Sequence, residues 1–180
     1  TAFRRLPTIS LRTARKYKPI SPVSTRMKPN IIERPEKQAI FVRRMGAYKK
    51  SAHAAWEAVC RYAQSHSLFA PGGEFIGISY DDPQITAAEN LRYDACITVS
   101  QAVKPDGEVG VRKIAGGRYA MFLHQGPYEN LLGTYQHIFK EWFPGSGEEL
   151  RDEPSFEVYL NSPDDTRPEE LKTEIYIPLK

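Results

Sequence analysis

The chain carries an internal repeat with a spacing of 80 residues. A Gly-x-Tyr motif at 46–48 returns at 126–128, and the segment 91–99 returns at 171–179 with the same alternation of apolar and polar residues. Self-similarity at a fixed period predicts two similar structural units. We therefore expect two halves related by a pseudo-two-fold axis, with a groove between them of the kind in which ligands usually bind.

The two copies differ most in chemistry at one position. Copy one has Gly77 where copy two has Glu157, and two residues later Ser79 corresponds to Tyr159. A symmetric scaffold is thus broken by one carboxylate that faces a position without a side chain, and the two small residues of copy one leave space opposite it. We take this asymmetry as the main indication of a functional site.

The first 28 residues differ in composition from the rest. They contain eight basic and no acidic residues, with Pro7, Pro19 and Pro22 among them. This composition predicts a basic flexible linker or tail followed by a folded domain at 29–180. Without the tail, 17 basic residues face 22 acidic ones, a balance of −5 that disfavours nucleic acid and anionic ligands.

The length and apolar content suit one domain or two small units that share a core. The chain has 180 residues, of which 41% are hydrophobic. Cys60 and Cys96 show no spacing typical of a disulfide framework or a zinc site. No apolar stretch approaches the roughly 20 residues that span a bilayer, and no secretory signal is evident. We expect a cytoplasmic protein without a membrane span, a metal or a cofactor.

Each copy shows the pattern of a strand, a helix and two further strands. In repeat one, at 29–101, we expect a strand at 39–43, a helix around 52–63 and strands at 74–80 and 91–100. In repeat two, at 109–180, we expect a strand at 118–124, a helix around 131–142 and strands at 155–161 and 172–179. The order predicts an α+β fold, a mostly antiparallel sheet with two helices packed on it, in which 102–108 links the halves.

Strand alternation assigns residues to faces, because side chains two positions apart point the same way. One set is apolar, and we expect it to line the core beneath the helices. That set is Ile76, Ile78, Tyr80, Phe156, Val158 and Leu160. Glu157 and Tyr159 point the other way, and in the last strand Glu174 and Tyr176 lie on the face away from the apolar residues. If these two strands pair, one face gathers two glutamates and two tyrosines.

Carboxylates between aromatic rings make a cage for an organic cation, because ring faces attract positive charge and the carboxylate supplies the opposite charge. Gly77 provides the open space in this arrangement, and further aromatic walls come from Tyr48, Trp56, Phe122 and Tyr128. Trp56 also fits the apolar stripe of its helix, which favours a core position. The alternative is that the polar residues are the solvated face of a half-exposed sheet. His124 has no partner at metal-ligand spacing and is expected to be structural.

Five blocks of sequence, in order, resemble the GyrI-like or AraC-type effector-binding domain family over residues 29–180. They are Asp81-Asp82-Pro83, Leu91-Arg92-Tyr93-Asp94, Gly116-Gly117-Arg118-Tyr119-Ala120, His124-Gln125-Gly126-Pro127-Tyr128 and Phe156-Glu157-Val158-Tyr159-Leu160-Asn161. The resemblance implies the duplicated strand-helix-strand-strand fold. It also implies one of several roles: a free-standing DNA gyrase inhibitor, the ligand-sensing domain of a multidrug-responsive regulator, or an isolated binder of cationic drugs.

In that family a pocket glutamate meets a cationic ligand, and the matching position here is Glu157. The resemblance therefore implies a domain that binds a lipophilic or aromatic cation. It serves either as the effector-sensing part of an AraC-type transcriptional regulator attached to a DNA-binding domain or as a free-standing multidrug-binding protein. The chain shows no complete helix-turn-helix in 1–28, so we expect no direct reading of DNA sequence.

Two alternatives stay open. A gyrase-inhibitor-like protein would act by contact with DNA gyrase, and some relatives are hydrolases that use a pocket glutamate, here Glu157, to activate water. The sequence has no Ser/His/Asp order, no metal-binding His-Glu-x-x-His and no phosphate-binding glycine loop. We therefore assign no catalytic residues and favour binding over catalysis.

Overall fold

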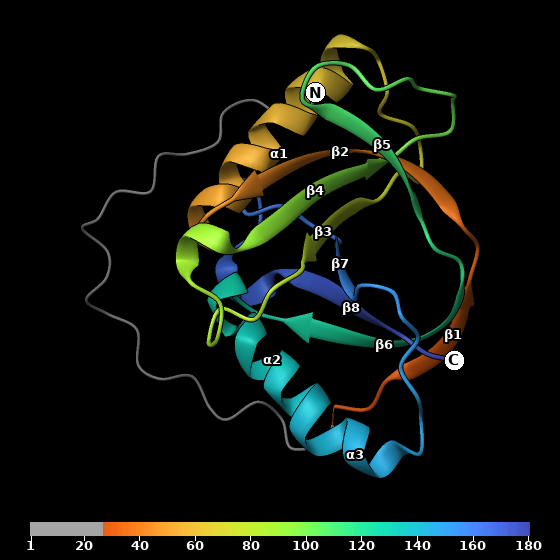
Figure 1. The fold of residues 1–180 in the computed structure, drawn as a ribbon, viewed down its shortest axis with the longest axis vertical. Helices are drawn as coiled ribbons and strands as arrows, with labels where there is room; N and C mark the ends of the chain where they lie inside the picture. The colour runs from red at the N-terminus through yellow and green to blue at the C-terminus, as the bar shows by residue number, and fades with distance from the viewer. Residues whose placement is uncertain (1–26) are drawn as a thin grey trace.

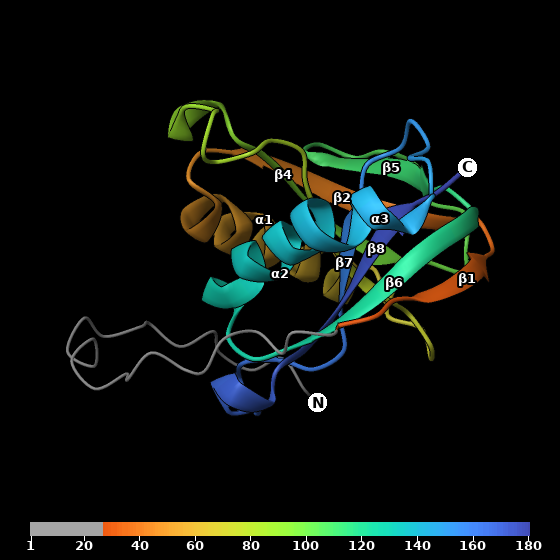
Figure 2. The same ribbon diagram turned by 90° about the horizontal axis from the view of Figure 1, so that it is seen from below.

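The computed structural model describes residues 27–180. The prediction of a basic flexible tail falls almost wholly on residues outside this range. The described chain forms an eight-stranded antiparallel sheet with helices on one face, which confirms the predicted α+β fold (Figure 1). In the view of Figure 2 the helices lie to one side of the strands.

The two halves contribute equivalent elements. The first half contains β1 (Asn30–Arg34), β2 (Lys37–Met45), α1 (Tyr48–Ser65), β3 (Phe75–Ser79) and β4 (Arg92–Thr98), with a short 3-10 turn at Ala88–Asn90. The second half contains β5 (Val109–Ile114), β6 (Gly117–Gln125), a helical region at 128–146, β7 (Phe156–Tyr159), a 3-10 turn at Pro168–Glu170 and β8 (Lys172–Pro178).

The strand order places the symmetry axis in the middle of the sheet. The order is β1-β6-β8-β7-β3-β4-β2-β5, so equivalent strands of the two halves lie at equal distances from the central pair β3 and β7. Across that pair Ile76 faces Val158 and Gly77 faces Glu157. The two residues that break the repeat are therefore direct neighbours at the axis.

The edge strands β1 and β5 are absent from the sequence prediction, and they exchange partners. β1 belongs to the first half but pairs with β6 of the second, and β5 belongs to the second half but pairs with β2 of the first. Polar and charged residues interrupt their apolar positions and weaken the strand pattern. Each half of the sheet is thus completed by a strand from the other half.

Two very short connections force the sheet to curl. Residues 35–36 join β1 to β2, and residues 115–116 join β5 to β6, although β1 and β2, like β5 and β6, lie near opposite ends of the strand order. Such short links require the two edges of the sheet to meet. Gly116 lies at this meeting point, where a Cβ would approach the Glu36 nitrogen to 2.6 Å and the Arg34 oxygen to 3.0 Å.

The sheet packs an apolar core on both faces. The core under α1 includes Ile40, Val42, Ala55, Val59, Ala63, Ala95 and Ile97, and the core under the second helical region includes Ala120, Phe122, Ile138, Ile175, Ile177 and Leu179. A third cluster fills the inside of the curl and contains Ala39, Ile76, Ile78, Cys96, Ile114, Tyr119, Phe156, Val158 and Tyr176.

The predicted grouping of alternate residues is confirmed, but the predicted face is wrong. Ile76, Ile78, Phe156 and Val158 share a face, and that face lies inside the curl and away from the helices. Alternation fixes which residues point together and leaves open which side the helices cover. Leu160 lies beyond the end of β7 and is 50% exposed.

The second helical region is interrupted where we expected one amphipathic helix. A 3-10 turn (Tyr128–Asn130) leads into α2 (Leu131–His137), a π-helical segment (Ile138–Trp142) and α3 (Phe143–Ser146). The wider π turn shifts the residues that follow it around the helix axis. Ile138 is buried, whereas the adjacent Phe139 is 40% exposed.

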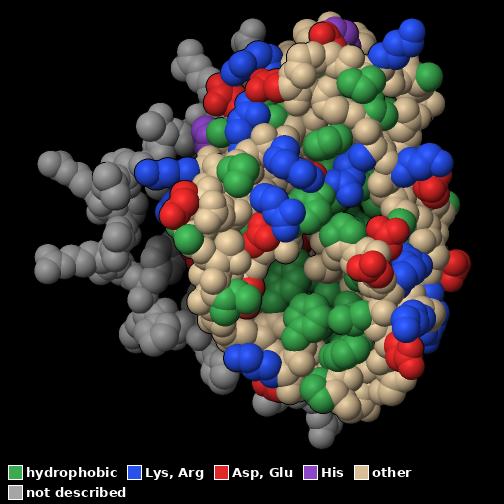
Figure 3. Space-filling view, in the orientation of Figure 1, with side chains coloured by type: hydrophobic (Ala, Val, Ile, Leu, Met, Phe, Trp, Pro, Cys, Tyr) green, Lys and Arg blue, Asp and Glu red, His purple; other side chains and the backbone are tan. Residues whose placement is uncertain are grey.

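Two surface properties bear on function. Over the described residues no helix combines the length and apolar character that crossing a bilayer requires. The face of the molecule seen in Figure 3 is hollowed near its centre, where apolar side chains gather below a group of arginine and lysine side chains.

We expect Gly116→Ala to lower the free energy of unfolding by about 1–3 kcal/mol, because the new Cβ would overlap backbone atoms of the β1–β2 link that cannot move aside. Urea denaturation measures the change. Gly145→Ala is the control, since a Cβ at this exposed position would have no atom within 4 Å. Equal stability of the two variants would contradict a tight junction between the sheet edges.

Candidate ligand-binding site

The site is centred on the carboxylate of Glu157. This residue lies on β7 at the symmetry axis, is only 6% exposed, and points to the face that the helices cover. Burial raises the pKa of the Glu157 carboxyl above its ordinary value, because the charged form loses its hydration. A buried carboxylate that forms no ion pair in the described chain is costly to keep charged, which singles it out as a functional group.

Two tyrosine hydroxyls donate hydrogen bonds to this carboxylate. The Tyr159 hydroxyl donates to Oε2 at 2.5 Å, and the Tyr135 hydroxyl, from α2, donates to Oε1 at 3.0 Å. Both bonds favour the charged form and so act against the effect of burial on the Glu157 pKa. Each carboxylate oxygen therefore has one neutral donor where an ion pair would supply a cation.

The hydrogen bonds continue into the first half of the chain. The Tyr93 and Tyr159 hydroxyls are 3.2 Å apart, and Trp56 Nε1 donates to the Tyr93 hydroxyl at 2.9 Å. Because the hydrogen of Tyr159 goes to Glu157, Tyr93 must donate to Tyr159. The hydrogen bonds of Trp56, Tyr93 and Tyr159 thus run in one direction and end at the Glu157 carboxylate. Burial and the nearby Glu157 charge raise the pKa of Tyr93, so its hydroxyl stays protonated.

Aromatic rings surround this series of hydrogen bonds. Trp56 of α1 meets the Tyr159 ring edge-on at 5.7 Å between centroids, and Tyr128 meets it at 5.4 Å. The ring centroid of Tyr48, at the start of α1, lies 6.2 Å from that of Tyr93. Burial raises the pKa of Tyr128 to about 12. The carboxylate is therefore enclosed by neutral rings contributed by both halves of the chain.

The absent side chain at Gly77 is a requirement of this packing. A Cβ at this position would lie 2.5 Å from the Tyr93 hydroxyl oxygen and 2.6 Å from that of Tyr159. The space that we expected opposite Glu157 is thus filled by the two tyrosine hydroxyls. The broken symmetry of the repeat has a structural reason, since glycine admits the side chains that solvate the carboxylate.

Most of the predicted site residues come together here. Glu157, Tyr159, Gly77 and Trp56 form the centre, and Tyr48 and Tyr128 contact its aromatic members. Phe122 is fully buried in the core under the second helical region, where it meets Trp142 at 5.0 Å.

The prediction that Glu174 and Tyr176 share a face with Glu157 is wrong. In the register of β7 and β8, Glu157 faces Ile175, whereas Phe156 faces Tyr176. Tyr176 stacks on Phe156 inside the curl at 4.9 Å and donates to Glu174. The alternation within each strand is as predicted. Sharing a face with Glu174 and Tyr176 would require Glu157 to lie opposite one of them, and the observed register differs from this by one residue. Glu174 and Tyr176 therefore point to the face opposite to that of Glu157.

His124 is buried next to the site and has a structural role, as expected. Its Nδ1 lies 2.8 Å from the Thr134 hydroxyl and its Nε2 lies 3.3 Å from the Pro127 carbonyl. Burial lowers the pKa of His124, so the neutral ring is favoured. The ring ties β6 to the beginning of α2 and leaves neither nitrogen available for a ligand.

The sequence analysis missed Tyr93 and Tyr135 as site residues. Both stand where the repeat also breaks, since Tyr93 corresponds to Thr173 and Tyr135 to Ala55. Comparing the two copies position by position, with attention to every polar aromatic residue, could have found them.

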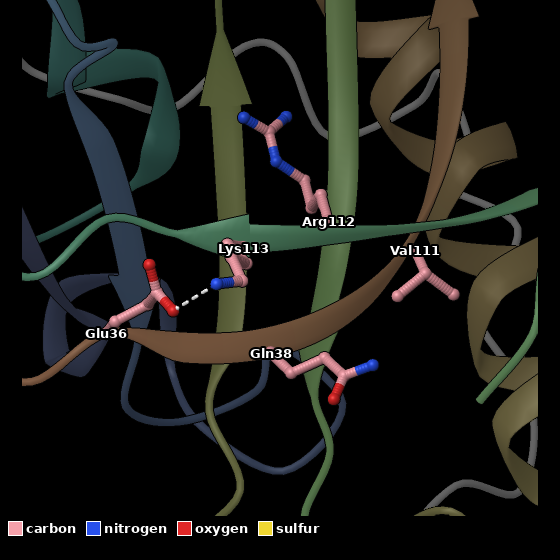
Figure 4. Close-up of a pocket in the computed structure, with 5 residues that line it drawn as sticks. All are labelled: Glu36, Gln38, Val111, Arg112 and Lys113. Carbon is pink, nitrogen blue, oxygen red and sulfur yellow. Dashed lines mark ion pairs between the residues drawn. The ribbon is translucent and has the colours of Figure 1, made fainter. Parts of the chain in front are cut away.

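A hollow of about 450 Å³ lies away from Glu157, at the edge formed by β2 and β5. It is lined by Glu36, Gln38, Val111, Arg112 and Lys113, and Figure 4 shows the ion pair between Glu36 and Lys113 across it. Its charged side chains form ion pairs, Glu36 with Lys113 and Arg112 with Asp94, and no aromatic ring lines it, so it lacks the features of the Glu157 site. Within residues 27–180 no group of three or more His, Cys, Asp or Glu side chains could hold a metal ion.

A buried carboxylate among aromatic rings, at the axis of a duplicated α+β domain, defines a small-molecule binding domain. Similarity to known proteins leads to the same class. Residues 27–180 match the family described as the GyrI-like small molecule binding domain, and the chain belongs to this family.

Three relatives illustrate the similarity. The probable transcriptional regulator YgiV of Escherichia coli strain K12 is 37% identical over 105 residues, which cover 57% of this chain and 65% of that protein. The C-terminal domain of EcmrR superposes with a TM-score of 0.74 at 18% identity, covering 86% of this chain and 98% of that one. SAV2435 bound to tetraphenylphosphonium superposes with a TM-score of 0.58 at 16% identity, covering 86% of this chain and 94% of that one.

We expect Tyr159→Phe to raise the pKa of Glu157 further, because the variant removes the donor that favours the charged carboxylate and leaves the ring in place. Tyr135→Phe should act in the same direction. Carbon-detected NMR of labelled glutamate side chains over a pH titration measures the shift. In the control Tyr62→Phe, near the end of α1, the Glu157 titration should match the wild type, and an unchanged pKa in Tyr159→Phe would show that the hydrogen bond does not solvate the charge.

Proposed function

We propose that the domain binds a lipophilic, aromatic cation at Glu157. This proposal rests on one observation. The Glu157 carboxylate is buried among aromatic rings, and its two oxygens accept hydrogen bonds only from neutral tyrosine hydroxyls. A cation placed beside Glu157 would supply the missing opposite charge, and the rings would attract it further through their faces.

The site must open for such a ligand to enter. Tyr159 and Tyr135 occupy both carboxylate oxygens, so the cation has to displace at least one hydroxyl. Tyr135 is the better candidate for movement, because it lies on the short α2 next to the π-helical segment, whereas Tyr159 is held in the central strand β7. The tyrosines act as neutral substitutes that keep the empty site folded. Selectivity then comes from charge combined with adaptable aromatic packing.

The similarities support an effector-sensing role. EcmrR is described in a complex with DNA, YgiV is named a probable transcriptional regulator, and SAV2435 is described as bound to tetraphenylphosphonium, a lipophilic cation. We propose that this domain works with an attached DNA-binding domain, so that ligand binding changes the relative stability of two arrangements of the whole regulator.

Calorimetric titration tests the proposal with tetraphenylphosphonium and rhodamine 6G against a neutral ligand of similar shape, triphenylphosphine oxide. We expect the cations to bind, and Glu157→Gln to weaken them by roughly 30-fold or more, because the variant keeps the shape of the side chain and removes its charge. Glu153→Gln, at an exposed carboxylate, is the matched control and should bind like the wild type. Equal binding of the neutral ligand, or no loss in Glu157→Gln, would refute the proposal.

Cation binding should also release protons. The raised pKa leaves part of Glu157 protonated at pH values just above the ordinary glutamate range, and a bound cation favours the charged form. Titrations in buffers of different ionisation enthalpy should therefore give different apparent enthalpies for the wild type and the same enthalpy for Glu157→Gln. The absence of buffer dependence across this pH range would contradict a shifted carboxyl group at the binding site.

The same shift fixes the sign of a stability effect. An acid with a higher pKa in the folded than in the unfolded state binds its proton more tightly when folded, so the free energy of unfolding falls as pH rises from the ordinary glutamate pKa of 4.5 through the raised value. Thermal unfolding over this interval should show the decline in the wild type. The difference in stability between Glu157→Gln and the wild type should grow in favour of the variant as pH rises, and a constant difference would contradict the burial of an unpaired charge.

A further inference from the structure

A second cluster of charged side chains lies on the opposite face of the sheet, on the side of the curl. Its centre is Asp94 of β4, which is fully buried. Arg43 donates to it from Nε at 2.7 Å and from Nη2 at 2.9 Å, Arg112 donates from Nη1 at 2.7 Å, and the Tyr80 hydroxyl donates at 2.7 Å. The carboxylate is therefore saturated with donors from three other parts of the sheet.

The cluster carries an excess of positive charge. Two guanidinium groups, those of Arg43 and Arg112, share the one carboxylate of Asp94. The neighbouring Arg92 has its own partner, since it forms two bonds to Asp81 at 2.8 and 3.0 Å. One cation of the cluster is therefore left without a carboxylate of its own. Exposed charges farther than about 10 Å from the cluster are largely screened by salt, so the local excess counts for more than the negative balance of residues 29–180.

The excess charge is accessible and lies against aromatic rings. The Arg43 side chain is 45% exposed and that of Arg112 is 23% exposed. The Arg43 guanidinium lies 4.8 Å from the Tyr80 ring centroid, and that of Arg112 lies 5.6 Å from the Phe41 centroid. The positive charge that Asp94 leaves uncompensated therefore favours an acceptor that carries negative charge.

The other copy keeps a carboxylate at the position of Asp94, namely Glu174, but lacks the groups that surround it. The equivalents of Arg43, Tyr80 and Arg112 in the other copy are all apolar. They are Leu123, Leu160 and Ile32, respectively. Since well-packed apolar residues can replace a buried ion-pair network with little loss of stability, the network around Asp94 calls for a reason other than folding.

We propose that Arg43 and Arg112 form a binding site for an organic anion, a carboxylate attached to a flat aromatic body. The carboxylate oxygens accept hydrogen bonds from the exposed parts of the Arg43 and Arg112 guanidinium groups. The aromatic body stacks on the exposed guanidinium planes, which the rings of Tyr80 and Phe41 support from beneath. The site is separate from Glu157 and takes ligands of the opposite charge, so it does not rest on the function proposed above.

Titration with 1-naphthoate and its neutral isostere 1-naphthamide, followed by calorimetry and by amide NMR shifts, tests the proposal. We expect naphthoate to bind and to shift the amides of β2, β4 and β5, and naphthamide to bind at least roughly tenfold more weakly. Arg112→Met should weaken naphthoate by a similar factor. It should stay folded, because Asp94 keeps Arg43 and Tyr80 as donors.

Lys113→Met is the matched control, because it removes one positive charge from the next residue of β5, where the side chain is 73% exposed and points to the other face. We expect it to bind naphthoate like the wild type, as should Glu157→Gln. If Arg112→Met does not fold, Arg112→Lys keeps the charge and removes the planar fork of guanidinium donors, and it should also bind more weakly. Equal affinity for the acid and the amide, wild-type binding in both Arg112 variants, or an equal loss in Lys113→Met would overturn the proposal.

Discussion

The two-residue links between β1 and β2 and between β5 and β6 determine the shape of the sheet. They join strands from opposite ends of the strand order, so the sheet has to curl until its edges meet at Gly116. The curl gives the sheet an inner face, filled by its own aliphatic and aromatic residues, and an outer face that only the helices can cover. Each face then has its own core and its own buried carboxylate.

The two buried carboxylates are stabilised in opposite ways. Asp94 is surrounded by guanidinium groups and carries more positive charge around it than it neutralises, whereas Glu157 has only hydroxyl donors. Tyr93, in the Glu157 site, and Asp94 are consecutive residues of β4, and they point to opposite faces because they are neighbours on a strand. One strand therefore contributes a residue to each cluster, so a displacement of β4 along its axis would move a residue in both.

The repeat made a large part of this architecture predictable. Equal spacing of the motifs implied two similar units, and the alternation in the last strands of each unit correctly grouped Ile76 with Ile78 and Phe156 with Val158. The exchange of Gly77 for Glu157 marked the centre of the candidate site. These features are local, or depend on a comparison within the chain, and a sequence displays them directly.

The features that escaped prediction depend on long-range pairing. Which face the helices cover, and the register that separates Tyr176 from Glu157, are set by packing between distant strands. The edge strands β1 and β5 take their partners from the other half of the chain, and no local pattern announces that exchange. Tyr135 reaches Glu157 only because α2 lies over β7, so its role becomes visible with the tertiary structure.

The pairing of Gly77 with Glu157 across the axis also has a consequence for how such a site can arise. Two identical separate subunits, related by a true two-fold axis, would place the same residue at both positions. Two glutamates would then face each other at a cross-strand distance of roughly 5 Å, where like charges repel, and two glycines would leave no carboxylate at all. Identical subunits therefore cannot place a single charge at the axis. Fusion of the halves in one chain removes this restriction, because each half can then acquire its own residue at the central pair.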